Sequence, residues 1–494
     1  LLLSAGCAIG LGNVWRFPFI TGKYGGAVFL AAYLLFLLFM GLPILIMEFS
    51  VGRASRRNMS KAFSVLEPAG TKWHWFGWFS PVGSYILMMF YMPVAGWMLY
   101  YMFASIPGGL AVPVDKVPEV FTGMLANPWL MTFWTVVVSL SCFYICSIGL
   151  QKGVERVVKF MMAGLLLIMV ALAVHAVTLP GAVEGLKFYL VPDFQRAWDA
   201  GILSLINDAM NQAFFTLSIG IGSMCIFGSY LNKNNTLTKE SAFIVSLDTF
   251  VALTAGLIIF PACFAFGVTP NAGPGLIFIT LPNVFNAMPY GQVWGTLFFI
   301  FMSAAALTTV IAVLENIISF FMDNYGWERR KSVLVNAVLL TLLTLPCILG
   351  FNEWSWIQPL GEGSCILDLE DFIISNNLLP IGSLIYCLFC CSRYGWGWDN
   401  FIAEADEGEG LKFPKALRFY LTKILPVVMI IYNTFWDGTK LDLEMFARVI
   451  LREENLTAMK NTVIIAIFAT LFATIVGVFF AWLLGRSDIP MKGL

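Results

Sequence analysis

Residues 6–18, Gly-Cys-Ala-Ile-Gly-Leu-Gly-Asn-Val-Trp-Arg-Phe-Pro, lie inside an apolar run long enough to cross a membrane. The stretch nevertheless carries three glycines, an asparagine, an arginine and a proline. Glycine at this density weakens a helix, and in hydrocarbon an unwound backbone is tolerated only where it lines a cavity or is buried in protein. We therefore predict a membrane helix that breaks here. Its half-helix ends would suit small ions and the charged ends of a zwitterion.

The composition of the whole chain agrees with a membrane location. Of its 494 residues 59% are hydrophobic and 12% charged, and the mean hydropathy is +0.81. A soluble protein this apolar could not cover its surface with polar groups, so an all-α polytopic protein in a lipid bilayer is predicted. The net charge of −1 gives no basis for a nucleic-acid partner.

Apolar runs of about 20 residues, the length that crosses a bilayer, predict about twelve transmembrane helices. They fall at residues 1–22, 27–50, 80–106, 127–148, 155–178, 201–230, 241–267, 289–322, 332–350, 371–391, 415–435 and 459–484. Residues 272–288 are too rich in proline and glycine to span, and we expect an external re-entrant or capping loop with one short helix. Residues 400–410 are acidic and are expected to form a solvated cytoplasmic loop.

Basic residues gather in alternate loops, which sets the expected orientation. Arg53, Arg56 and Arg57 follow span two, and Arg329 and Arg330 follow span eight. The opposite loops are richer in acidic residues. We expect these basic loops and the N-terminus in the cytoplasm, and the protein in the cytoplasmic (inner) membrane. Residue 1 already lies within span one, so the start of the natural chain is expected to be missing.

A second break is predicted in span six, where residues 208–222 again combine polar groups with two glycines. Matching interruptions five helices apart indicate two five-helix repeats of inverted orientation, with the binding site between the breaks. The predicted repeats are residues 1–178 and 201–392, and C-terminal helices occupy 411–494. The alternative is two ordinary kinked helices with close glycine packing.

Several motifs together resemble the neurotransmitter:sodium symporter family, in its bacterial amino-acid transporter branch. They are the opening stretch 6–18, Tyr-Gly-Gly-Ala at 24–27, Gly-Leu-Pro-Ile-Leu-Ile-Met-Glu at 41–48, Phe-Phe-Thr-Leu-Ser at 214–218 and Ala-Ala-Leu-Thr-Thr at 305–309. The resemblance covers about residues 1–425. It implies a sodium-coupled symporter with broken helices one and six, and no enzyme.

The resemblance implies two sodium sites. The first would use Ala8, Asn13, Thr216, Asp248 and the substrate carboxylate. The second would use backbone carbonyls of Gly6, Ile9 and Ala305 with the hydroxyls of Thr308 and Thr309. All of these groups offer oxygen, which suits a hard cation. For the two threonines the alternative is a hydroxyl bonded back to its own helix.

Two acidic residues lie within membrane spans. A buried carboxylate such as Asp248 needs a compensating cation, and chloride-dependent relatives have no acid near this sodium site. We therefore expect no chloride requirement. The resemblance gives Glu48 a structural role as an acceptor for the unwound backbone of spans one and six.

Gly10 indicates the substrate class, because monoamine transporters of the family carry an aspartate at the matching position. With glycine here, the substrate should bring its own carboxylate, which would contact Leu11, Gly12 and Tyr91. Its amine would meet Ala8, Phe215, Thr216 and Ser218. The side-chain pocket would be Met88, Phe215, Ile221, Thr309 and Val313, which favours a neutral, apolar amino acid.

Two gates are implied by the same resemblance. Arg16 and Asp371 would form the outer ion pair, with Gln212 nearby, although Arg16 could instead extend to the membrane interface. Asp323 would be the acidic half of the inner gate, with a partner in a segment before residue 1.

The chain departs from the family pattern after about residue 425. Residues 425–494 resemble the start of an ABC-importer permease subunit, although two poorly matched final helices are an equal alternative. An enzyme is disfavoured because the chain holds only two histidines, His74 and His175, and no metalloprotease, P-loop or nucleophile-elbow motif. A sodium-permeable channel or a non-transporting binding protein on the same fold remain the rival functions.

Overall fold

The computed structural model describes residues 2–149, 154–267 and 275–435. Within these ranges the regular elements are all helices. One isolated β-bridge pairs Asn235 with Glu409. Eight of the described helices are long and apolar enough to cross a membrane. The predicted all-α polytopic fold is confirmed. The twelfth predicted span and most of the permease-like tail lie outside the described residues.

Span one is broken where the opening stretch predicts. Helix α1 (Leu2–Ala8) ends before Gly10, and the chain resumes as the π-helix η1 (Gly12–Arg16) and α2 (Phe17–Lys23). Residues 9 and 10 belong to no helix. The freed groups are partly satisfied by Asn13, whose Oδ1 accepts from the N–H of Gly10 at 3.1 Å.

Span six is broken in the same way. Helix α12 (Ile202–Thr216) and α13 (Ser223–Tyr230) are separated by six residues in which Gly220 and Gly222 have φ of 96° and 83°. Such values are left-handed backbone, which glycine adopts without strain. A Cβ at Gly220 would also lie 2.4 Å from the carbonyl oxygen of Leu379, so the close approach of span ten requires glycine there.

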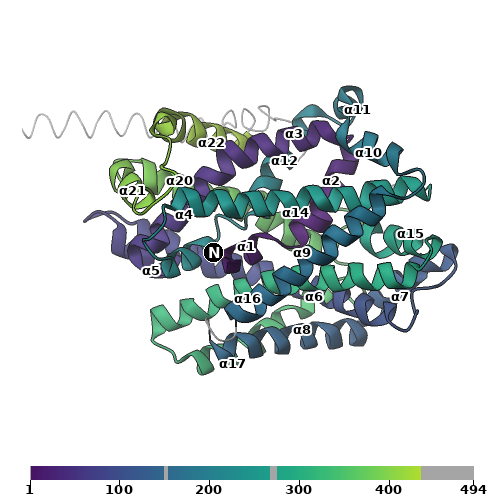
Figure 1. Ribbon diagram of the computed structural model, residues 1–494. Helices are drawn as coiled ribbons and strands as arrows, with labels where there is room; N and C mark the ends of the chain where they lie inside the picture. Colours follow the sequence, from purple (N-terminus) through teal and green to yellow (C-terminus); the bar gives the residue numbers. More distant parts are fainter. Residues whose placement is uncertain (1, 150–153, 268–274, 436–494) are drawn as a thin grey trace, which may run out of the picture. The chain divides into compact units, whose positions relative to one another are not determined.

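Long unbroken helices surround span one. Helix α1 lies at the centre of the described bundle (Figure 1), against α9 (Glu155–Val177), α14 (Leu237–Ala265) and α16 (Gly291–Tyr325). Helix α16 packs extensively on α6 (Phe79–Ser105), and α6 packs on α8 (Pro128–Ile148).

The remaining spans contain π-helical or short interruptions. Span two is α3 (Ala27–Phe36), η2 (Leu37–Gly41) and α4 (Leu42–Ser55), and span nine is α17 (Arg329–Leu343) and α18 (Leu345–Leu349). Span ten is α19 (Ile366–Phe372), η7 (Ile373–Leu378) and α20 (Leu379–Cys391), and span eleven holds η8 (Lys415–Leu417), η9 (Tyr420–Ile424) and α22 (Leu425–Phe435). Short helices occupy the loops: α5 (Met59–Leu66), η3 (Trp73–Trp78), η4 (Val114–Lys116), α7 (Val117–Leu125), α10 (Ala182–Leu190) and α11 (Phe194–Asp199).

The loop predicted to cap the outside contains helix, as expected. Residues 276–287 form η6 (Leu276–Thr280) and α15 (Leu281–Ala287). Ile277 and Phe278 are fully buried, and Tyr101 of α6 donates to the Phe278 carbonyl at 3.1 Å.

The prediction of a solvated loop at residues 400–410 is wrong for the first half of this segment. Helix α21 (Trp398–Ala405) covers its first half and buries Phe401, Ile402 and Ala405 against the bundle. These positions recur at helical spacing, a signal that the acidic composition obscured. The acid at position 404 is not solvated either: Glu404 is 8% exposed and forms an ion pair with the fully buried Arg53 at 2.5 Å.

Candidate functional site

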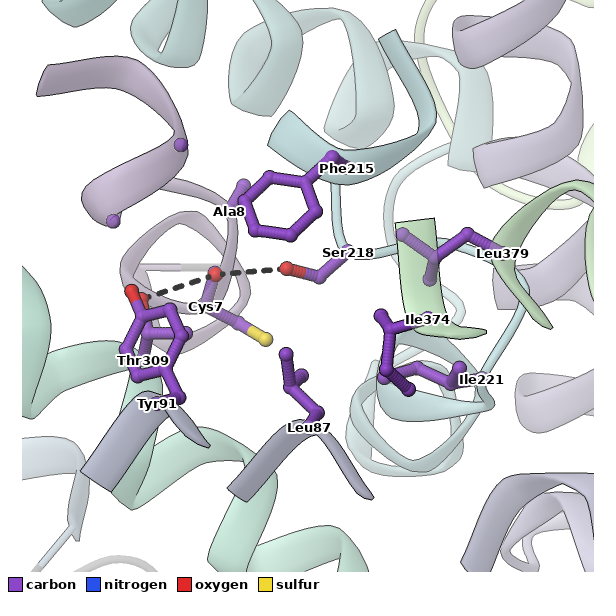
Figure 2. A pocket seen from close by; sticks show the side chains of 12 residues that line it. Cys7, Ala8, Leu87, Tyr91, Phe215, Ser218, Ile221, Thr309, Ile374 and Leu379 are labelled. Carbon is purple, nitrogen blue, oxygen red and sulfur yellow. Dashed lines mark hydrogen bonds between the residues drawn. The ribbon is translucent and has the colours of Figure 1, made fainter. Parts of the chain in front are cut away.

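A small cavity lies between the two breaks. It has a volume of about 20 Å³, enough for about one water molecule. Its lining residues come from spans one, three, six, eight and ten: Cys7, Ala8, Gly10, Gly12, Leu87, Tyr91, Phe215, Ser218, Ile221, Thr309, Ile374 and Leu379. Figure 2 shows the labelled side chains converging on this space.

The backbone carbonyl of Cys7, which has no partner within its own helix, links three of the spans around the cavity. It accepts from the hydroxyl of Ser218 at 3.3 Å and from that of Thr309 at 3.5 Å (Figure 2). Because α1 ends at the next residue, this carbonyl is one of the four that a helix terminus leaves without an intrahelical partner. The broken backbone therefore presents acceptors to the site, as the opening stretch predicts.

Gly10 is tightly enclosed by neighbouring side chains. A Cβ at this position would lie 2.4 Å from Thr309 Oγ1 and 2.7 Å from the Tyr91 hydroxyl oxygen. The same hydroxyl accepts from the N–H of Leu11 at 3.0 Å. A side chain at position 10 would displace both hydroxyls. Glycine is therefore required here by packing, in addition to its predicted bearing on the substrate class.

Asp248 of α14 is completely buried beside span one. Its carboxylate accepts from the Asn13 amide at 2.7 Å, from the Thr216 hydroxyl at 3.1 Å and from the Tyr33 hydroxyl at 3.4 Å. Three of the four side chains and backbone groups predicted for the first sodium site, Asn13, Thr216 and Asp248, are therefore in direct contact. Tyr33 was not predicted, since nothing in the apolar run of span two marks it.

The groups predicted for the second sodium site lie where α1 meets α16. Thr308 donates to the carbonyl of Ala305 at 2.9 Å, which is the bond to its own helix considered as the alternative. The Thr309 hydroxyl has two acceptors: the Ala305 carbonyl of its own helix at 3.4 Å and the Cys7 carbonyl of span one. Gly6 is close-packed beneath them: its Cβ would lie 3.7 Å from Thr308 Cβ.

Glu48 supports the break in span six. Its carboxylate accepts from the N–H groups of Gly220 at 2.8 Å, Met224 at 3.1 Å and Cys225 at 3.3 Å. These are N–H groups that the start of α13 and the preceding turn leave unpaired. All three bonds go to span six, whereas contact with both broken spans was expected.

On the side predicted to face outward, the cavity is closed by charged and aromatic side chains. Arg16 Nη1 lies 3.3 Å from Asp371 Oδ1, and its guanidinium sits 4.6 Å from the centre of the Phe215 ring. Ser375, one helical turn after Asp371, was not predicted but joins both partners at 2.5 and 2.7 Å. Gln212 lies deeper and donates to the carbonyl of Gly12 at 2.8 Å.

Beyond this ion pair is a larger vestibule of about 270 Å³. Its lining combines aromatic and acidic side chains: Leu11, Trp15, Arg16, Phe19, Ile20, Phe90, Tyr91, Val94, Asp208, Phe215, Leu367, Asp368 and Asp371. Tyr91 and Phe215 belong to both cavities, so they form the partition between vestibule and site.

On the side predicted to be cytoplasmic, Asp323 has partners in the loop after α4. Its carboxylate accepts from the N–H of Asn58 at 3.1 Å and lies 3.7 Å from Arg57 Nη1. These contacts join span eight to the segment that follows span two, whereas the resemblance implied a partner before residue 1.

The predicted side-chain pocket and the observed lining differ: two predicted residues do not line the cavity, and several that were not predicted do. Met88 and Val313 are fully buried but do not line the cavity, and Leu87 faces it in place of its neighbour. Ile374 and Leu379 of span ten also line it, and no pattern in the sequence pointed to them.

An all-α membrane fold with a cavity between two broken spans is the architecture of a secondary transporter. Known proteins of similar sequence agree with this class. The chain matches the Sodium:neurotransmitter symporter family over residues 1–114 and 123–445. It is 33% identical to a sodium-dependent transporter of Bacillus subtilis (strain 168), over 87% of this chain and 94% of that protein.

Two further similarities support the assignment. A sodium-dependent transporter of Haemophilus influenzae is 33% identical over 87% of this chain and 95% of its own length. The crystal structure of MhsT in complex with L-phenylalanine superposes with a TM-score of 0.79 at 37% identity, covering 87% of this chain and 96% of MhsT. The chain belongs to the Sodium:neurotransmitter symporter family and is a multi-pass membrane protein with that family's fold.

The family match also bears on the tail. It continues to residue 445, about 20 residues past the point at which we expected the resemblance to end. The permease-like character of the residues beyond stays a prediction.

Proposed function

We propose that this protein imports a neutral, apolar L-amino acid together with sodium, in the cytoplasmic membrane and with its N-terminus inside. The observation that carries the proposal is the pair of broken spans that meet around Gly10, Cys7 and Ser218. This cavity is uncharged, so a substrate there would have to be neutral overall and would supply its own carboxylate. The bound ligand of MhsT, L-phenylalanine, has this chemistry.

The contact groups around Asn13 support a first sodium site with oxygen from Ala8, Asn13, Thr216 and Asp248. Oxygen-rich surroundings with one fixed negative charge suit a small hard cation. A second site would use Gly6, Ile9, Ala305, Thr308 and Thr309, where hydroxyls now bonded to carbonyls would turn to the ion. Because Asp248 already supplies the negative charge, chloride is not required.

The substrate would be held by both half-helices. Its carboxylate would meet the N–H groups of Leu11 and Gly12, the Tyr91 hydroxyl and the first sodium ion. Its amine would meet the carbonyls around Ala8 and Phe215 and the hydroxyl of Ser218. A space of about 20 Å³ cannot hold an amino-acid side chain, so binding requires Phe215 and the lining residues of span ten to move apart.

Transport would proceed by alternating access. Sodium binding favours opening of the Arg16–Asp371 gate, and substrate binding lets this gate close again. Spans one, two, six and seven then move against spans three, four, eight and nine, which separates the contacts between Asp323 and Asn58. The sodium gradient drives the cycle.

Reconstituted liposomes test the proposal. With sodium outside and potassium inside, the protein should accumulate labelled L-phenylalanine, or another neutral amino acid from a small panel, above its external concentration. Equal and non-concentrative uptake in sodium and potassium would favour the channel alternative. Binding without uptake would favour the non-transporting binding protein.

A further inference from the structure

Span ten carries a buried acid that neither the proposed sodium sites nor the gates use. Glu370 lies in α19 and is 4% exposed. Neither carboxyl oxygen has a hydrogen-bond partner of normal geometry among the described residues. Among the described residues, the thiol of Cys347 in α18, a weak donor, interacts with it.

Glu370 differs in this from Glu48 and Asp248, two other buried acids of the bundle. Glu48 accepts from three backbone N–H groups, and Asp248 accepts from three side chains. A carboxylate without such donors or a nearby cation is costly inside a membrane protein. In this conformation the group is therefore expected to carry a proton.

The described elements that pack most extensively on α19 offer no charge to compensate Glu370. They are η7, α6 and α18. Helix α6 contains no Asp, Glu, Lys, Arg or His, and its Tyr91 is engaged with Leu11. The π-helix η7 contains no titratable side chain, and α18 contributes only Cys347.

The acids on α19 itself are engaged elsewhere. Asp368 accepts from the N–H of Cys365 at 2.7 Å, and Asp371 pairs with Arg16. Leu367, Asp368 and Asp371 share the helix face that lines the vestibule. At 100° per residue, Glu370 points well away from the centre of that face, and its side chain interacts with Cys347 of α18.

The backbone provides a means of moving this group. Helix α19 is seven residues long and is followed at once by the π-helix η7. Interruptions of this kind are frequent at functional hinges. A tilt of α19 at η7 would carry Glu370 and the gate residue Asp371 together.

We propose that Glu370 is a proton-binding site coupled to the outer gate. With the gate closed, its carboxyl is protonated and buried; when α19 tilts and the Arg16–Asp371 pair separates, the carboxyl reaches the vestibule and releases its proton to external water. Closure reverses the step and takes up one proton. The coupling rests on the gate role proposed above, whereas protonation in the closed form does not.

Infrared spectroscopy tests the protonation directly. The purified protein is measured in potassium chloride, without sodium or amino acid. Wild type should show a carboxylic C=O stretching band that E370Q lacks. Glutamine has nearly the same shape as the neutral acid, so this variant should fold. Coinciding spectra in that region would overturn the proposal.

Proton release tests the coupling. A weakly buffered sample with a pH indicator is moved from potassium to sodium chloride at constant ionic strength, and wild type should release up to one proton per molecule more than E370Q. The matched control, E362Q, replaces an exposed acid in the segment just before α19 and should release as much as wild type. Equal release from wild type and E370Q would contradict the coupling. If sodium changes neither proton release nor tryptophan fluorescence in any variant, the proposed sodium response fails, and the infrared band still decides the state of Glu370.

Discussion

At the residue scale, Gly10 has the most tightly defined environment in the site. The neighbouring hydroxyls of Thr309 and Tyr91 leave no room for a Cβ. We expect Gly10→Ala to lower amino-acid affinity at least about tenfold, or about 1.4 kcal/mol, because Tyr91 would be pushed from the N–H of Leu11. Equilibrium binding to the purified protein measures the effect.

The control for this variant is Gly164→Ala. Gly164 lies within α9, and a Cβ there would meet nothing within 4 Å. Alanine should leave binding unchanged and add up to about 1 kcal/mol of helix stability. Unchanged affinity in Gly10→Ala would mean that the site does not lie between the two breaks.

Asp248 is the residue on which the proposed absence of a chloride requirement rests. Replacing chloride by gluconate should leave wild-type uptake within about twofold, because the carboxylate already balances the cation. In Asp248→Asn this charge is lost, and uptake should fall at least about tenfold and recover partly with chloride. The exposed Asp399→Asn serves as control. Strict loss of wild-type uptake in gluconate would overturn the assignment of Asp248.

At the element scale, the two breaks could be predicted because each depends on glycines and polar residues within one short stretch of sequence. Hydrocarbon tolerates a stretch of glycines and polar residues only where the backbone lines a cavity or is buried in protein. The contacts that tie the breaks to their surroundings could not be predicted in the same way. Ser375 and Tyr33 contact the site through the packing of spans ten and two, and local sequence carries no record of such packing.

Helix α21 is a second case in which tertiary contacts could not be predicted from local sequence. Its apolar positions were present in the sequence, but four acids in residues 400–410 suggested a solvated loop. The structure places the Glu404 carboxylate on Arg53, which also donates to the carbonyl of Asn235 at 3.0 Å. Nearby, a hydrogen bond from Lys233 lowers the pKa of Glu407. Helix α21 is thereby fixed to span two and to the loop between spans six and seven.

This arrangement predicts a large effect of Arg53→Ala on stability. Removing one partner of a buried ion pair costs about 3–5 kcal/mol, and contact of Glu404 with Lys233 at 3.6 Å would offset part of it. Thermal unfolding in detergent, followed by a thiol-reactive dye, should show a clearly lowered midpoint. Lys187→Ala, which removes an exposed pair with Glu184, should change the midpoint little. Equal effects of the two variants would show that α21 is not held through Arg53.

At the scale of the whole molecule, span count and loop charge together predict which face is outside. Residues of α10 and α21 should lie on opposite sides of the membrane. In intact cells, a membrane-impermeant thiol reagent should label Glu184→Cys at once, and should label Asn400→Cys only after permeabilisation. Both positions are exposed. The reverse pattern would place the N-terminus outside.

The architecture was predictable from the sequence to a greater extent than the pocket. Periodic apolar runs and alternating loop charge locate spans, since these signals follow from the bilayer itself. A small rotation of helix α6 about its axis decides which of its side chains face the cavity. The prediction therefore chose Met88, whereas the structure has its neighbour Leu87 in the lining. The contribution of span ten, through Ile374 and Leu379, depends on the π-helix η7, which no pattern of residues marks.

The most direct test of the account is equilibrium binding of each of the twenty labelled amino acids to the purified protein, in sodium and in potassium at equal ionic strength. We expect one or a few neutral, apolar L-amino acids to bind in sodium, with binding at least about tenfold weaker in potassium. Binding that is equal in both cations, or that prefers charged amino acids, would contradict a site in which the broken helices hold sodium and a zwitterion together.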